Sequence, residues 1–106
     1  GMYLVQDIVL NHTGNFFEYA ELPPAGDPAQ GWRLVDAEQQ PTRWPFTAND
    51  PRRRRDRELG AYHWTPAVRD YSDPEQLYHW QMAGLDDLAT GNPVVRRALR
   101  EAYGYW

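Results

Sequence analysis

The chain has 106 residues, which is long enough for one small domain with a thin core. Its formal net charge of −4 argues against a general nucleic-acid binder. It contains no cysteine, so a disulfide framework and a thiolate metal site are excluded. No apolar run approaches the roughly 18 residues of a membrane-spanning helix and no signal peptide is visible, so we expect no membrane partner.

The first predicted element is a strand between Tyr3 and Leu10. Its Val, Ile and Leu residues form an apolar run that is too short for a convincing helix and favours a buried strand. The polar residues 11–14 end this strand and place donors and acceptors at its carboxyl end, the edge where binding and catalysis gather in α/β proteins. Residues 15–19 predict a short helical or irregular turn.

The middle of the chain is rich in proline and aromatic residues, which predicts loops held by large rings. Residues 21–51 contain too many Pro and Gly for long regular elements, and leave room for short strands near Gly31–Val35 and Arg43–Phe46. The run Pro51–Arg57 predicts a solvated, mobile loop, with contact to an anion or nucleic acid as the minor alternative. Gly60–Thr65 could form another strand.

Two helices are predicted from their first residues. Asp73 before Pro74, and Asn92 before Pro93, each combine an N-cap side chain with proline at the first helical position. The second helix is the clearest element, because apolar residues recur at helical spacing from Val95 to Trp106 while arginines fill much of the opposite face.

Two clusters of polar residues could carry chemistry. Asp7, Asn11 and His12 would converge if the chain turned at the end of the first strand, although each also has an ordinary structural explanation. The adjacent carboxylates Asp86 and Asp87 are typical of a turn near a helix. Alternatively, one of them supplies a hard oxygen ligand for calcium beside the carbonyl of Asn11.

The other histidines and the tryptophans give weaker indications of function. His63 and His79 do not share metal-ligand spacing with His12. The tryptophans of the middle segment are more typical of core packing, with stacking on a carbohydrate ring as the alternative.

The segment Asp7–His12, DIVLNH, resembles the first signature of the α-amylase family of glycoside hydrolases, Asp-x-Val-x-Asn-His at the end of the third barrel strand. Residues Gly84–Leu88, followed by a helix that starts at Asn92-Pro93-Val94-Val95, resemble a later motif of the same family. That helix ordinarily ends near an aromatic pair such as Tyr105-Trp106. Between the two motifs the family carries an irregular domain B, which the proline-rich middle fits in place, length and character.

The resemblance implies the fold class. It predicts an α/β fragment in which one strand and one helix of a (β/α)8 (TIM) barrel flank an irregular α+β insertion, and not a complete barrel. Residues 1–12 would be the third barrel strand and residues 13–83 the domain-B-like insertion. Residues 84–106 would form a calcium-loop-like turn and an amphipathic barrel helix.

The resemblance also implies roles for individual residues. Asp7 matches the structural aspartate of the first motif, and His12 matches a residue that hydrogen-bonds the sugar where cleavage occurs. Asn11 and Asp87 match calcium ligands found in some members, so calcium is the implied cofactor. The family often has Pro where Asp86 stands, so the local turn is expected to differ.

No residue of this chain matches the catalytic groups of the family. Retaining glycosidases need a carboxylate nucleophile and a carboxylic acid about 5–5.5 Å apart, which in the family come from the fourth and fifth strands. The chain stops before the fourth strand, so we expect a partial glycoside hydrolase or transglycosylase that is inactive alone. Its substrate in the full-length enzyme would be an α-glucan, sucrose or an oligosaccharide.

Two other functions stay open. The chain could be a stand-alone carbohydrate-binding or protein-interaction module that uses its exposed aromatic rings. Nucleic-acid binding through Arg52–Arg57 conflicts with the acidic net charge. A barrel strand and helix without their neighbours would expose apolar surface, so we also predict self-association, most simply as a symmetric homodimer.

Overall fold

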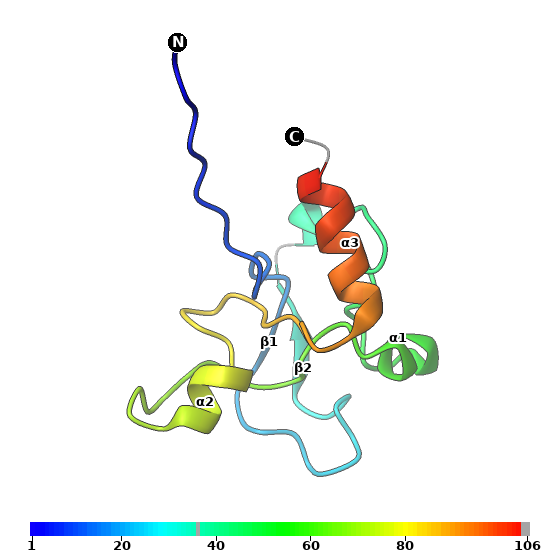
Figure 1. Ribbon diagram of the computed structural model, residues 1–106. Helices are drawn as coiled ribbons and strands as arrows, with labels where there is room; N and C mark the ends of the chain where they lie inside the picture. Colours follow the sequence, from blue (N-terminus) through cyan, green and yellow to red (C-terminus); the bar gives the residue numbers. More distant parts are fainter. Residues whose placement is uncertain (36, 105–106) are drawn as a thin grey trace.

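The computed structural model describes residues 1–35 and 37–104. In this part of the chain short elements alternate with long irregular segments (Figure 1). The elements are strands β1 (Phe17–Tyr19) and β2 (Trp32–Leu34), the 3-10 helix η1 (Ala37–Gln39), and helices α1 (Arg54–Leu59), α2 (Pro74–His79) and α3 (Pro93–Gly104).

The predicted fold class is wrong: the described residues form a small α+β domain and not a strand and a helix of a (β/α)8 barrel. The sheet is a two-stranded antiparallel hairpin in which Phe17 lies opposite Leu34 and Tyr19 lies opposite Trp32. Consecutive antiparallel strands need only a loop between them, whereas the parallel strands of a barrel need a helical crossover between each pair.

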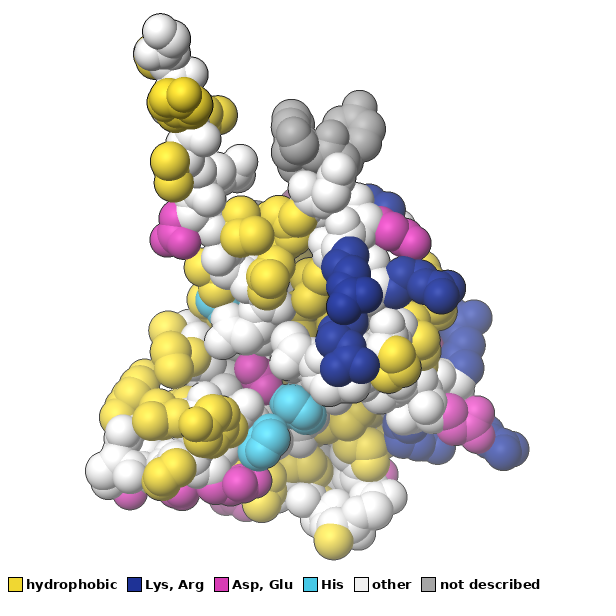
Figure 2. All heavy atoms as spheres, viewed as in Figure 1, with side chains coloured by type: hydrophobic (Ala, Val, Ile, Leu, Met, Phe, Trp, Pro, Cys, Tyr) yellow, Lys and Arg dark blue, Asp and Glu magenta, His cyan; other side chains and the backbone are white. Residues whose placement is uncertain are grey.

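The N-terminal segment accounts for the main error. Its apolar side chains from Met2 to Val5 are between 91% and 98% exposed, and the segment extends away from the body of the molecule (Figures 1 and 2). Within the described residues, no strand pairs with residues 1–10. A short apolar run becomes a buried strand only where other strands and helices cover it, and that cover is not a property of the run itself.

The core lies where β1 meets the segment around Tyr62 and the first turns of α3. Phe17 is fully buried, and its ring packs edge-on against Tyr19 and Tyr62 at centroid distances of 6.0 and 5.4 Å. Val95 of α3 and Leu88 complete the apolar contacts. Edge-to-face aromatic pairs add to the burial of their own apolar area, so Phe17 is the centre of the core.

Both predicted helix starts are confirmed. The Asn92 side chain accepts a hydrogen bond from the Val94 N–H at 2.9 Å, and Asp73 accepts one from the Glu75 N–H at 3.0 Å. Each bond satisfies one of the N–H groups that a helix leaves free at its start. The predicted end of the second helix, at Trp106, lies outside the described residues.

Other expectations for the middle of the chain have mixed outcomes. The strand expected near Gly31–Val35 is confirmed as β2, but residues 15–19 contain β1 in place of a turn. Arg43–Phe46 is irregular, and the arginine run leads into α1 in place of a mobile loop. Gly60–Thr65 is not a regular strand, although Tyr62 forms a single antiparallel bridge to Leu88.

Candidate functional site

Three irregular segments lie side by side and form what we call the junction: residues 11–14, residues 61–63 and residues 86–89. The Leu88 N–H donates to the Asn11 carbonyl at 2.8 Å, and the Thr13 N–H donates to the Asp86 carbonyl at 2.9 Å. On the other side, the His63 N–H donates to the Asp87 carbonyl at 3.0 Å. Residues 86–89 are therefore the middle strand of a short antiparallel ladder.

The junction brings together three of the four residues to which the resemblance gives a role. His12 and Asp87 are bridge partners in the ladder, and the Asn11 side-chain oxygen contacts His12 Nδ1 at 2.9 Å. Asp7 lies outside the junction, on the exposed N-terminal segment. The two motif segments thus meet through their backbones, although they are far apart in the sequence.

Asp87 has a partner that the sequence did not indicate. Its Oδ2 lies 2.6 Å from His63 Nδ1, and Asp87 itself is only 8% exposed. The His63 and His79 rings form a T-shaped pair at a centroid distance of 4.9 Å. The linear spacing of His63 and His79 does not reveal this contact, because it depends on the pairing of residues 61–63 with residues 86–89.

Asp86 lies on the opposite side of the same strand and is fully buried. Its Oδ2 accepts hydrogen bonds from the N–H groups of Phe16 at 2.8 Å and Phe17 at 3.3 Å. Its Oδ1 accepts one from the Gln81 side-chain amide at 2.9 Å. Burial raises the pKa of Asp86 to about 8, and the backbone N–H donors oppose that rise. Asp86 is therefore a structural group that ties residues 86–89 to β1.

His12 also lines a small hollow of about 200 Å³ beside the junction. The wall of this hollow includes the aromatic rings of Phe46 and Tyr103 and the side chain of Thr13. When His12 Nδ1 donates its proton to Asn11, the other ring nitrogen, Nε2, is free to accept a hydrogen bond. The hollow is therefore lined by two polar residues, His12 and Thr13, among apolar and aromatic ones, the combination that small-molecule sites use.

As they lie, the residues of the junction do not provide a calcium site. Calcium takes six to eight oxygen ligands, whereas the carboxylate of Asp87 and the amide oxygen of Asn11 each already contact a histidine. In the described part of the chain, no three His, Asp or Glu side chains form a group that could hold a metal ion. Calcium binding remains a prediction from the resemblance, and the donor set gives it no support.

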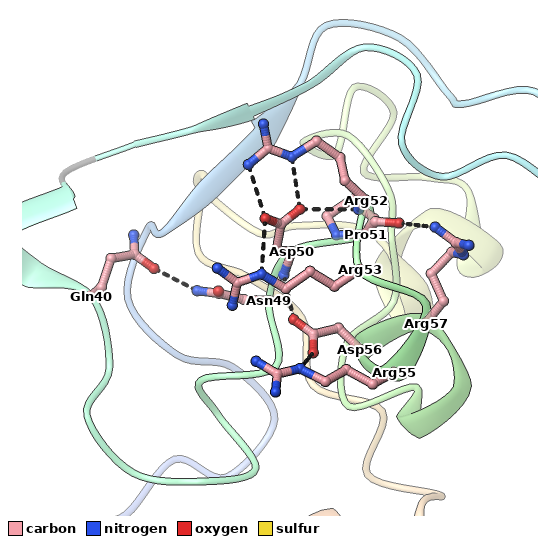
Figure 3. A network of polar contacts seen from close by, with 9 residues as sticks. All are labelled: Gln40, Asn49, Asp50, Pro51, Arg52, Arg53, Arg55, Asp56 and Arg57. Atoms are coloured by element: carbon pink, nitrogen blue, oxygen red, sulfur yellow. Dashed lines mark hydrogen bonds and ion pairs between the residues drawn. The ribbon is translucent and has the colours of Figure 1, made fainter.

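The arginine run forms a separate network (Figure 3). The Arg52 guanidinium donates to both carboxylate oxygens of Asp50 at 2.9 Å, and this pairing holds the pKa of Asp50 below its usual value. Arg52 also lies over the Trp32 ring, 4.6 Å from its centroid. Asp56, only 3% exposed, accepts a hydrogen bond from the Asp50 N–H and pairs with Arg55. These arginines therefore neutralise carboxylates of their own chain.

Comparisons of the chain with family models, with curated proteins and with solved structures found no match. Among the described residues, no helix combines the length and the apolar character needed to span a membrane.

Proposed function

We propose that this chain is part of an α-amylase-type glycoside hydrolase or transglycosylase acting on α-glucosidic carbohydrates, and that it contacts the sugar through His12. The chain contains no match to the catalytic carboxylates of that family, so it contributes binding and not bond cleavage. Purified alone, the 106-residue chain should release no reducing sugar from starch, sucrose or maltooligosaccharides.

The observation that carries the proposal is the contact between the two motif segments. The resemblance implies that Asn11, His12 and Asp87 belong to one site, and the hydrogen bond from the Leu88 N–H to the Asn11 carbonyl joins their two segments. This contact does not follow from the resemblance of either segment alone. It therefore supports the proposal independently of the sequence patterns.

The hollow beside His12 supports a sugar as the ligand. A pyranose ring has an apolar face that stacks on flat side chains and hydroxyl groups that need hydrogen-bond partners. Phe46 and Tyr103 supply rings, while His12 and Thr13 supply polar side chains. We expect one sugar ring to occupy this hollow.

The test is a titration of the purified chain with maltooligosaccharides, followed by tryptophan emission and by calorimetry. The His12→Ala variant should bind about 2- to 12-fold more weakly, because one hydrogen bond contributes about 0.5–1.5 kcal/mol. Tyr78→Ala is the matched control, since this ring is 75% exposed and does not line the hollow. Equal affinity of the wild type and His12→Ala would contradict the proposal.

The same titration distinguishes the second candidate, a carbohydrate-binding or protein-interaction module without catalysis. The observation in its favour is a set of highly exposed aromatic rings: Trp44 is 62% exposed, Tyr71 is 60% exposed and Tyr78 is 75% exposed. If these rings carry the binding, Tyr78→Ala should weaken it and His12→Ala should not.

A further inference from the structure

The contact between His63 and Asp87 is the closest side-chain link inside the junction, and the proposed sugar site does not use it. His63 Nδ1 lies 2.6 Å from Asp87 Oδ2, and the His63 N–H also donates to the Asp87 carbonyl at 3.0 Å. Residues 61–63 are thus joined to Asp87 by both backbone and side chain. A carboxylate as buried as Asp87 needs such a partner, because an unpaired buried charge is strongly destabilising.

A divalent cation would meet the same need in another way. It would neutralise the Asp87 carboxylate and tie residues 86–89 to residues 11–14 through the amide oxygen of Asn11. In this structure, however, His63 contacts Asp87 and His12 contacts Asn11. Calcium takes oxygen ligands, and an imidazole already contacts each of the two oxygens that it would need.

The surroundings keep the His63 ring in place. The His79 ring forms a T-shaped pair with it at an interplanar angle of 86°, and His79 Nε2 in turn lies 3.8 Å from a carboxylate oxygen of Glu75. The His63 side chain is 33% exposed, whereas that of Asp87 is 11% exposed. The imidazole is therefore the more exposed partner of the pair, and the Asp87 carboxylate is largely shielded from solvent.

We propose that His63 is a positioning residue that partners the Asp87 carboxylate in place of a metal ion: by donating Nδ1–H to Asp87 it holds residues 86–89 against residues 61–63, so the junction keeps its geometry without calcium. The inference concerns how the junction is held and does not depend on sugar binding. It predicts that the wild-type protein neither binds calcium nor gains stability from it.

The first test measures the response of the wild-type protein to calcium. Thermal unfolding should give the same midpoint in calcium chloride, in magnesium chloride and in EDTA, and calorimetric titration with calcium chloride should show no saturable heat. A rise in the midpoint with calcium and not with magnesium, or saturable calcium binding, would overturn the proposal.

The second test follows hydrogen exchange at single amides in variants of His63. In His63→Leu the exchange of the Ala89 amide and of the amide at position 63, which bond between residues 61–63 and residues 86–89, should accelerate by about ten-fold or more relative to the buried Ala98 amide. In His63→Asn the side-chain amide nitrogen occupies the position of Nδ1 and should restore most of the protection. His79→Leu, which removes the neighbouring ring and leaves Asp87 its partner, is the matched control.

Each outcome of the second test decides the question. Faster exchange confined to the ladder, with rescue by His63→Asn, supports the positioning role. Equal acceleration at all amides, or the same ladder effect in His79→Leu, overturns it. If His63→Leu does not fold, His63→Asn still decides: retained protection at Ala89 supports the proposal, and lost protection contradicts it.

Discussion

Asp86 offers the sharpest test of how the buried polar groups hold this fold. Replacing it with alanine removes the acceptor of the buried Phe17 N–H and of the buried Gln81 amide. A buried donor without a partner costs about 1–3 kcal/mol, so near pH 5 we expect Asp86→Ala to lower the free energy of unfolding by about 2–6 kcal/mol. This is a large part of the roughly 5–15 kcal/mol that stabilises a typical domain.

The Asp86→Asn variant separates the charge from the hydrogen bonds. Its amide oxygen still accepts from the two backbone N–H groups, and the side chain cannot ionise. Its amide nitrogen faces the Gln81 amide and cannot accept that bond, a loss that is the same at every pH. The pKa of Asp86 rises from 3.8 to about 8 on folding, so the folded chain keeps a proton that the unfolded chain releases. Wild-type stability should therefore fall as the pH rises from about 4 to 8, by up to about 1.4 kcal/mol per pH unit.

Urea unfolding followed by tryptophan emission at several pH values measures both effects. Asp86→Asn should lose most of this slope and should become relatively more stable toward pH 8. Asp7→Asn, which removes a carboxylate on the exposed N-terminal segment, should keep the wild-type slope. An Asp86→Asn variant whose stability declines with pH as steeply as the wild type would refute the reasoning, as would an Asp86→Ala variant as stable as the wild type at pH 5.

Three further predictions concern the core, the arginine network and association. Phe17→Ala empties the centre of the core and should lower the free energy of unfolding by about 3–5 kcal/mol, measured by urea unfolding, and should weaken the near-ultraviolet circular dichroism. A decrease in the free energy of unfolding below about 1 kcal/mol would show that Phe17 is not central. Since Arg52 lowers the pKa of Asp50, the stability from this pair should be present above pH 4 and decline as the pH falls below it. In Arg52→Gln the free energy of unfolding should fall less steeply below pH 4. An unchanged decline in that variant would exclude the pair as its cause. The exposed apolar residues Leu4 and Val5 should make the protein self-associate in light scattering; the Leu4→Asp variant should shift it toward the monomer, and a wild type that stays monomeric at high concentration would contradict the prediction.

The parts of the fold that could be predicted from the sequence are those with local signals. Asn92 and Asp73 cap helices through bonds to residues two positions away, so their own neighbours contain the information. β1 was missed because its partner β2 follows an irregular loop and its burial depends on Tyr62 and Leu88. The apolar run near the N-terminus had a strand's composition, but whether a run is covered depends on the rest of the fold.

The candidate site could likewise be predicted only in part from the sequence. The resemblance indicated that Asn11, His12 and Asp87 share a site, and the ladder brings them together. It gave no sign of His63, because the contact with Asp87 depends on the register between residues 61–63 and 86–89. Two adjacent aspartates also looked equivalent in the sequence. Because successive residues of a strand point to opposite sides, Asp86 faces β1 while Asp87 faces the histidine.

The junction contains several buried polar groups close together, so its geometry should be sensitive to single substitutions. The buried polar residues of the described chain include Asp86, Asp87 and Gln81, all within one short segment, alongside a thin aromatic core. Buried polar contacts add little net stability when complete but are costly when one partner is removed. Changes in the core should therefore lower the stability of the whole domain, whereas changes at His63 should first loosen the contact of residues 86–89 with residues 61–63. His12 pairs with Asp87 in the same ladder, so the geometry of the hollow depends on the hydrogen bonds of the junction more than on the size of the core.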